Sequence, residues 1–260
     1  MASWIKRHPL AVFYIFAYAI TWLAWLPQAA YSRGLFPFDS PIFYFVGGIG
    51  PMLAAYIVLK AQQGERAIGT LFAPLLRWKT SVIWYVIAVS GFAVIGIVAA
   101  ALGGDLRNQL RTLDLTAGLI MTFIWYLIAA IPEEVAWRGF ALPRLQTRYS
   151  ALVSSLIIGL LWALWHLPLL LNTDNVMSTY PKDLFLIEIL AASVIYTWLF
   201  NSTRGSVLIV TIYHCFVNTV GAVLEIGRLE QTVVMVIAAL LIILVFGASN
   251  LSRLGRQTFT

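Results

Sequence analysis

The fold of this chain is decided by apolar stretches such as residues 82–102, VIWYVIAVSGFAVIGIVAAAL. This stretch holds 21 residues without one charged side chain. About 20 helical residues cross the roughly 30 Å of hydrocarbon in a bilayer. Backbone amides in lipid must bond within a helix or a closed barrel, and a long run without alternation fits a helix. The stretch therefore predicts a transmembrane helix.

Similar apolar segments recur along the whole chain. The composition agrees, because 61% of the residues are hydrophobic and only 11% are charged, whereas soluble domains carry about 25% charged residues. We predict an all-α, polytopic membrane protein with about eight transmembrane helices in a single domain, residues 1–260. The other seven predicted spans are Leu10–Ala30, Ile42–Leu59, Ala117–Ile131, Ala151–Leu171, Leu184–Phe200, Ser206–Leu224 and Thr232–Ala248.

The positive charge of the chain follows the predicted topology. With eight spans, 12 of the 17 Lys and Arg residues lie in the N-terminus, the even-numbered loops and the C-terminus, which share one side. The positive-inside rule then places both termini in the cytoplasm, and the short loops indicate a bacterial cytoplasmic membrane. Anionic lipid headgroups supply the counter-charge to the net charge of +6, so we expect the lipid bilayer, and no nucleic acid, as a partner.

Ionisable side chains inside the apolar segments indicate chemistry, because such groups are costly at bilayer depth and usually mark function. The first set follows the fourth predicted span in the sequence IPEEVAWRG, residues 131–139. Glu134 and Arg138 stand at i and i+4 with the acid first, the favourable order for a salt bridge. Glu133 is then left available. The alternative is that all three residues simply begin a solvated loop.

Two further polar elements lie on other predicted spans. His166 ends a long uncharged run, and His214 and Asn218 share one helical face one turn apart. Two donors aimed at one point suit a developing oxyanion. The alternatives are a hydrogen-bonded core histidine at position 166, and an interhelical hydrogen-bonding pair at positions 214 and 218. We expect the three elements to converge on one site.

These motifs, in this order, resemble a known family. Glu-Glu-x-x-x-Arg (Glu133, Glu134, Arg138), an aromatic-x-x-x-His (Trp162, His166) and His-x-x-x-Asn (His214, Asn218) are similar to the motifs of the CPBP family, the CAAX-protease and bacteriocin-processing (Abi) membrane endopeptidases. The motif match covers about Ile131 to Asn218, and the eight-span layout agrees across the whole chain. We expect the catalytic core to span about residues 117–224. Trp162 stands where the family usually has Phe, and we expect it to serve as an aromatic wall.

The resemblance implies an intramembrane endopeptidase that acts on a membrane-associated peptide or protein. Together with the chemistry it predicts that Glu133 acts as general base on a water held with His166. Glu134 and Arg138 are expected to hold Glu133 in place, and His214 and Asn218 to stabilise the oxyanion.

A metallopeptidase is the alternative mechanism. Glu133, His166 and His214 form a sufficient ligand set for catalytic zinc, with water in the open position. The chain lacks a His-Glu-x-x-His sequence, and Asn218 suits an oxyanion better than zinc, so the water mechanism is favoured. A thiolate cluster and an intrachain disulfide are excluded because Cys215 is the only cysteine. We expect Cys215 to be a core filler.

Two other classes of function remain open. A non-catalytic membrane scaffold or immunity protein is one, and a transporter is the other, although paired broken spans typical of transporters are not evident.

The depth of the predicted site in the bilayer requires an adjustment of the predicted spans. Glu133 and His166 meet only if the fourth span continues past Pro132, the helices tilt, or the link from Phe140 to Ser150 enters the bilayer.

Overall fold

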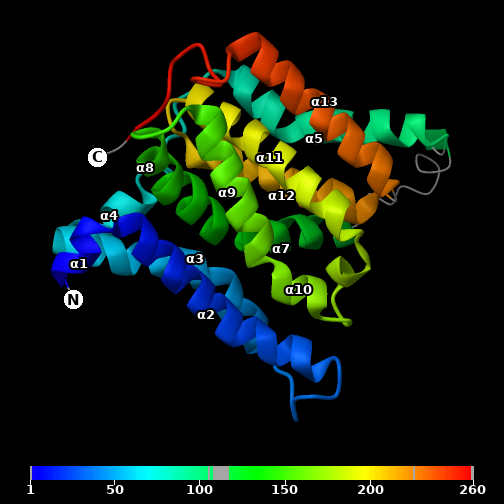
Figure 1. Cartoon of the computed structure of the whole chain (residues 1–260). Coiled ribbons are helices and arrows are strands. Elements are labelled where there is room, and N and C mark those ends of the chain that lie inside the picture. Colours follow the sequence, from blue (N-terminus) through cyan, green and yellow to red (C-terminus); the bar gives the residue numbers. More distant parts are fainter. Residues whose placement is uncertain (1, 105, 108–116, 225, 259–260) are drawn as a thin grey trace.

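The computed structural model describes residues 2–104, 106–107, 117–224 and 226–258, and every regular element in these ranges is helical (Figure 1). The α-helices are α1 (Ala2–Arg7), α2 (Pro9–Tyr31), α3 (Pro41–Gln63), α4 (Ala67–Phe72), α5 (Val82–Leu102), α7 (Ala117–Glu134), α8 (Leu142–Gln146), α9 (Ala151–Trp165), α10 (Leu167–Leu171), α11 (Lys182–Ser202), α12 (Val207–Val223) and α13 (Arg228–Phe246). A π-helix, η2 (Val135–Ala141), joins α7 to α8, and η1 (Gly64–Arg66) and η3 (Val176–Thr179) are 3₁₀ turns.

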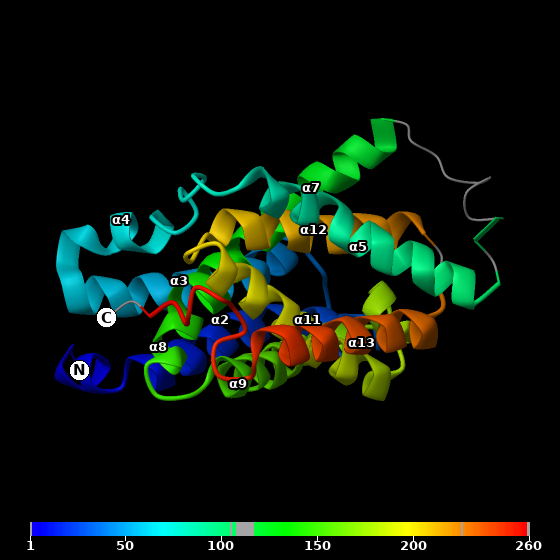
Figure 2. The ribbon, with the colours of Figure 1, turned by 90° about the horizontal axis from the view of Figure 1, so that it is seen from above.

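The predicted all-α membrane bundle is confirmed, since each of the eight predicted segments contains a helix. By length and composition, six helices in the described ranges can cross a membrane. The helices α9 and α12 are shorter, with 15 and 17 residues. α12 lies beside α5 and α7, and α11 lies beside α9 and α13 (Figures 1 and 2). The polar motifs on α7, α9 and α12 thus belong to one bundle.

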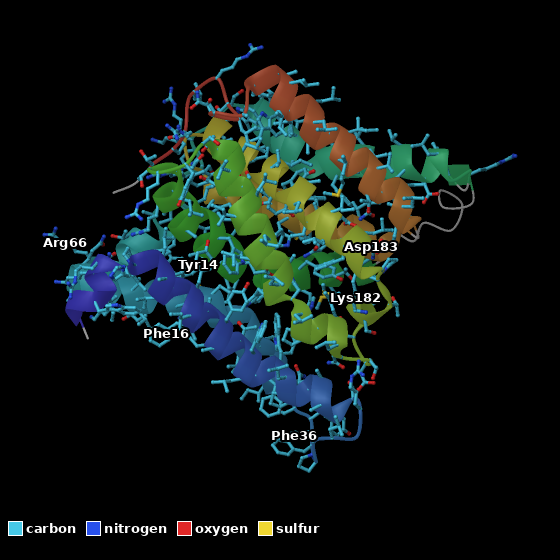
Figure 3. The ribbon with its side chains drawn as sticks, in the orientation of Figure 1. Tyr14, Phe16, Phe36, Arg66, Lys182 and Asp183 are labelled. Carbon is cyan, nitrogen blue, oxygen red and sulfur yellow. The ribbon has the colours of Figure 1, made fainter. Side chains whose placement is uncertain are left out.

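Helices α2 and α3 form a hairpin whose tip carries Phe36 (Figure 3). Gly47 and Gly50 allow the two helices to approach closely, because a Cβ atom at either position would overlap a side chain of α2. The hydroxyl of Thr21 donates to the carbonyl oxygen of Gly47 at 2.7 Å. The hairpin contacts α7 through α3, and α9 and α10 through α2. It therefore forms one side of the bundle.

The fourth predicted span does not end before Pro132. α7 passes through Pro132 to Glu134 and continues as η2 and α8, so that a single candidate span covers Leu119–Gln146. Proline is tolerated inside a membrane helix because neighbouring groups satisfy the backbone that it frees. This continuation confirms the first of the three expected adjustments, and it places Glu133 within the helix rather than at its end.

The fifth predicted span is interrupted, unlike the continuous helix expected from the sequence. α9 ends at Trp165 and α10 begins at Leu167, with His166 between them. The physical reason is Pro168, which has no backbone N–H and whose ring would meet the carbonyl of Leu164 in a continuing helix. His166 therefore lies at a break inside the bundle.

Candidate active site

Four of the six predicted site residues meet at one cavity. Glu133 from α7, His166 from the α9–α10 break, and His214 and Asn218 from α12 all line a cavity of about 600 Å³. This volume lies within the range of roughly 300 to 1,000 Å³ typical of small-molecule sites. The convergence expected from the sequence is therefore present in the structure.

Glu134 lies behind the cavity and is fully buried. Its Oε1 accepts a hydrogen bond from Nη1 of Arg138 at 2.9 Å, and the same oxygen lies 2.8 Å from Nδ1 of His214. The salt bridge expected between Glu134 and Arg138 is thus observed. We expected Glu134 and Arg138 to support Glu133; in the structure Glu134 contacts His214 directly, and Arg138 holds Glu134.

Arg138 is also fully buried. Its guanidinium carbon lies 4.6 Å from the ring centres of both Trp162 and Tyr196, which gives the cation two aromatic neighbours. Its Nε and Nη2, and Oε2 of Glu134, have no hydrogen-bond partner in the part of the chain that the structure describes. The burial of Glu134 and Arg138, and the continuous helical segment Leu119–Gln146, rule out the alternative in which this motif begins a solvated loop.

Glu133 is oriented by Trp162, which we expected to serve only as an aromatic wall. Nε1 of Trp162 donates a hydrogen bond to Oε2 of Glu133 at 2.7 Å. The indole also packs against His166 and His214, with ring centres 5.7 and 5.5 Å away. Trp162 is therefore more than an aromatic wall. The sequence feature that could have indicated this hydrogen bond is the indole N–H of Trp162, which stands one helical turn before His166.

The ring of His166 is fixed by its own helix. Nδ1 lies 2.8 Å from the carbonyl oxygen of Trp162. A carbonyl can only accept, so Nδ1 carries the proton and donates it, which leaves Nε2 of the neutral ring as an acceptor. Trp165 and Phe185 pack edge-to-face against the same imidazole. His166 is therefore held in one tautomer with one nitrogen left for chemistry.

His214 makes its contact with Glu134 through Nδ1, so its Nε2 is the atom left for the cavity. Asn218 lies one turn further along α12 and lines the same cavity. Cys215, the residue next to His214, is buried and its thiol donates to the carbonyl oxygen of Phe123 at 3.2 Å. This contact agrees with the expected role of Cys215 as a core residue.

Two comparisons with known proteins agree with the motifs at this site. Residues 115–220, which include all six site residues, match the family described as Type II CAAX prenyl endopeptidase Rce1-like. A CAAX prenyl protease 2 of Methanococcus maripaludis is 24% identical over 261 residues, covering 94% of this chain and 96% of that protein. Both similarities support a relationship to the CAAX protease (CPBP) family. The similarities and the apolar helices together support an integral membrane protein.

Besides Trp162, the cavity at the candidate active site has a second aromatic wall that the motifs did not reveal. Trp25 from α2, Tyr44 from α3 and Trp125 from α7 line it. The rings of Tyr44 and Trp125 are stacked at 16° with centres 6.1 Å apart. Trp25 and Tyr44 come from helices without a polar motif, and the packing of the α2–α3 hairpin brings them to Trp125 on the motif-bearing helix α7. Sequence spacing carries no signal for such a contact.

The positions of Glu133, His166 and His214 bear on the zinc alternative. Glu133, His166 and His214 all line the cavity. Nevertheless, no three His, Cys, Asp or Glu side chains within the described ranges are arranged to hold a metal ion. The contacts of His214 with Glu134 and of Glu133 with Trp162 leave Nε2 of His214 and one oxygen of Glu133 unused. Because the side chains are not grouped as a metal centre in this arrangement, the reaction below is derived without a metal.

Proposed function

We propose that this chain hydrolyses a peptide bond of a membrane-associated peptide or protein, using a water activated by Glu133 and His166. The observation that carries this proposal is the meeting of four polar side chains from three separate segments, α7, the α9–α10 break and α12, at one cavity. The carboxylate of Glu133 is oriented by Trp162, and the backbone contact of His166 leaves its Nε2 able to accept. A general base and a water-positioning group are thus both preorganised.

In the proposed reaction, Glu133 removes a proton from the water while Nε2 of His166 accepts a hydrogen bond from it. The water oxygen forms a bond to the scissile carbonyl carbon, and the negative charge moves to the carbonyl oxygen. In the proposal His214 is an imidazolium with Nδ1–H directed to Glu134, so its Nε2–H and the amide of Asn218 donate to that oxygen. Glu133 then gives the proton to the amide nitrogen as the C–N bond breaks. The products are a carboxylic acid, which then loses the second water proton to the amine, and the resulting ammonium group; no acyl-enzyme is formed.

We assign Glu134 and Arg138 a positioning role. The contact of Glu134 with Nδ1 of His214 fixes the ring, Arg138 holds Glu134, and the aromatic rings around Arg138 keep this cluster out of water. Fixed donors in a water-excluded site stabilise transition-state charge more strongly than donors in water. In the proposal, the glutamate pair therefore serves two tasks, with Glu133 on the water and Glu134 on the oxyanion donor.

The proposal is tested by comparing membrane-associated peptides from cells that carry the chain with peptides from cells that carry Glu133→Gln. Gln keeps the size of Glu but cannot take the proton, and loss of a general base costs about 10²- to 10⁴-fold in rate. We expect an uncleaved substrate to accumulate only with Glu133→Gln. Glu65→Gln is the matched control, because the Glu65 side chain is 95% exposed and pairs with Lys60 away from the cavity.

Three outcomes would contradict the proposal. A cellular task performed fully by Glu133→Gln and by His166→Ala would favour a non-catalytic scaffold or immunity protein. Solute flux in reconstituted vesicles that survives Glu133→Gln would favour a transporter. Purified protein that loses hydrolysis on chelation and regains it with zinc would support the metal mechanism instead.

We also propose a substrate class and a topology. The family and the methanococcal relative are both named for CAAX prenyl proteolysis, so a prenylated C-terminal peptide is the first substrate to test. The excess of Lys and Arg on one side supports termini in the cytoplasm of a bacterial cell. Fusion of a periplasm-dependent reporter enzyme to the C-terminus should give an inactive reporter, and an active reporter would reverse the topology.

A further inference from the structure

A second cavity lies away from the proposed active site, at the start of α5 and the end of α11. It has a volume of about 480 Å³ and is lined by the residues Lys79, Thr80 and Ser81 before α5, and by Ser202, Thr203 and Arg204 at the end of α11. Both helices are candidate membrane spans. The cavity therefore lies where two spans reach the boundary between hydrocarbon and water.

The charge of this second cavity is positive and uncompensated. Lys79 and Arg204 are both exposed, and neither forms an ion pair within the described residues. The sequence places no Asp or Glu in residues 66–104, 189–224 or 231–260, which include the segments that line the cavity. Two cations without a nearby acid attract an anion, and anionic headgroups are the abundant anions at this depth.

A buried hydroxyl adds an unused hydrogen-bonding group. Ser202 is only 6% exposed, lines the second cavity, and its Oγ has no partner among the residues that the structure describes. Serine in a helix commonly bonds the carbonyl one turn earlier, as the neighbouring Thr203 does with Leu199 at 2.7 Å. The hydroxyl of Ser81 makes no capping bond to α5 either. Both hydroxyls can therefore donate to a ligand.

The turn that carries Arg204 is held by bonds to the segment before α5. Nη1 of Arg77 donates to the carbonyl oxygen of Arg204 at 3.0 Å, and Ser206 Oγ donates to the carbonyl oxygen of Arg77 at 2.6 Å. Arg204 has a φ of 56°, a left-handed conformation that is uncommon outside glycine. These contacts keep the two walls of the second cavity together, so Lys79 and Arg204 face a site that is already formed.

We propose that this second cavity binds the phosphate group of an anionic lipid headgroup. Lys79 and Arg204 neutralise the phosphate, and the hydroxyls of Ser81 and Ser202 donate hydrogen bonds to its oxygens. The indole of Trp84, which also lines the cavity, lies at the depth that amphipathic aromatic rings prefer. The site is separate from the proposed catalytic cavity, so its occupancy is measured without reference to peptide hydrolysis.

The test uses the full chain, delipidated in detergent and then mixed with phosphatidylglycerol and phosphatidylcholine, with retained lipid counted by native mass spectrometry. We expect the wild type to retain phosphatidylglycerol in preference to phosphatidylcholine. Lys79→Gln/Arg204→Gln should reduce this retention at least about tenfold, because each cation near a headgroup contributes about 1 kcal/mol. Ser202→Ala should reduce it several-fold without any change in charge.

Two matched controls separate a built site from general attraction. Arg66→Gln removes an exposed cation that does not line the second cavity, and Ser154→Ala removes another buried, unpartnered serine hydroxyl outside it. Both controls should retain lipid as the wild type does. Equal retention by wild type and Lys79→Gln/Arg204→Gln would overturn the proposal. So would full displacement of lipid by millimolar glycerol 3-phosphate, which would assign the site to a soluble phosphate.

Discussion

At the scale of single residues, Trp162 connects the parts of the proposed active site. Its N–H bonds Glu133, its carbonyl fixes His166, and its ring packs on His214 and on the guanidinium of Arg138. One side chain thus contacts the general base, the water-positioning ring and the oxyanion donor. Phenylalanine at this position would keep the packing and the backbone contact but would lose the hydrogen bond.

Trp162→Phe should therefore lower kcat about ten- to a hundredfold and leave KM nearly unchanged, because a hydrogen bond to a charged group contributes about 1.5 to 3 kcal/mol. The measurement is steady-state cleavage of a membrane peptide by reconstituted protein. Trp198→Phe is the control, since the indole N–H of Trp198 bonds no other described residue and the ring packs on Trp84 and Phe246. An unchanged kcat in Trp162→Phe would remove Trp162 from the mechanism.

The sequence predicted which polar residues gather, but not how they pair. Costly ionisable groups in apolar segments identified Glu133, His166 and His214, and helical spacing identified the bond between Glu134 and Arg138. The contact of Glu134 with His214 joins residues 80 positions apart, and no local spacing encodes it. The roles assigned to these residues in hydrolysis remain predictions.

At the scale of helices, the local sequence predicted where the helical segments lie, but not whether a helix passes through a proline or changes to another helix type. Pro132 was a reasonable place for α7 to kink or restart, yet the helix passes through it and becomes η2. π-helical turns are rare and occur often at functional sites. Their extra residue per turn depends on surrounding packing, so a single sequence does not reveal them.

The α2–α3 hairpin offers an element-scale prediction with an internal control. Gly47→Ala should lower the free energy of unfolding by about 1 to 3 kcal/mol, because the new methyl group overlaps the Trp25 ring. Gly48→Ala should have little effect, since a Cβ atom there meets nothing within 4 Å. Thermal unfolding in one detergent compares the two variants. Equal stability of the two would show that close packing at Gly47 is unimportant.

At the scale of the whole molecule, the C-terminal segment closes over two helices through buried amides. The side-chain amides of Gln146 and Asn201 bond each other at 2.7 and 3.0 Å. Asn201 also donates to the carbonyl of Asn250 at 2.8 Å and accepts from the backbone N–H of Gln257 at 3.2 Å. This network ties the residues after α13 to α8 and α11.

Asn201→Leu should release this segment, because it removes these bonds and leaves the buried amide of Gln146 without a side-chain partner. An unsatisfied buried group costs about 1 to 3 kcal/mol. We expect trypsin to cut faster after Arg253 and Arg256, as followed by mass spectrometry. Gln257→Ala is the control, since only the backbone of Gln257 takes part in the network. Resistance to trypsin in Asn201→Leu would contradict this account.

The whole-molecule architecture was largely predictable, because hydrophobic length determines membrane helices almost directly. The order in which the helices pack against one another was not predictable. The aromatic wall of the catalytic cavity and the second, basic cavity both depend on contacts between distant segments, and those contacts follow from side-chain fit. Composition therefore predicted a membrane bundle, and motifs predicted a site, while the shape of each cavity required coordinates.

The placement of Glu134 and Arg138 on one helix has a consequence for biogenesis. A buried charge costs about 2.5 to 3.5 kcal/mol when a nascent segment partitions from the translocon into lipid. These two residues stand one turn apart, so they can cancel each other's charge as soon as their segment emerges. His214 reaches them only after the ribosome has added 80 further residues to the position of Glu134. The chain can thus enter the bilayer as a neutral intermediate, with the reactive centre assembled late.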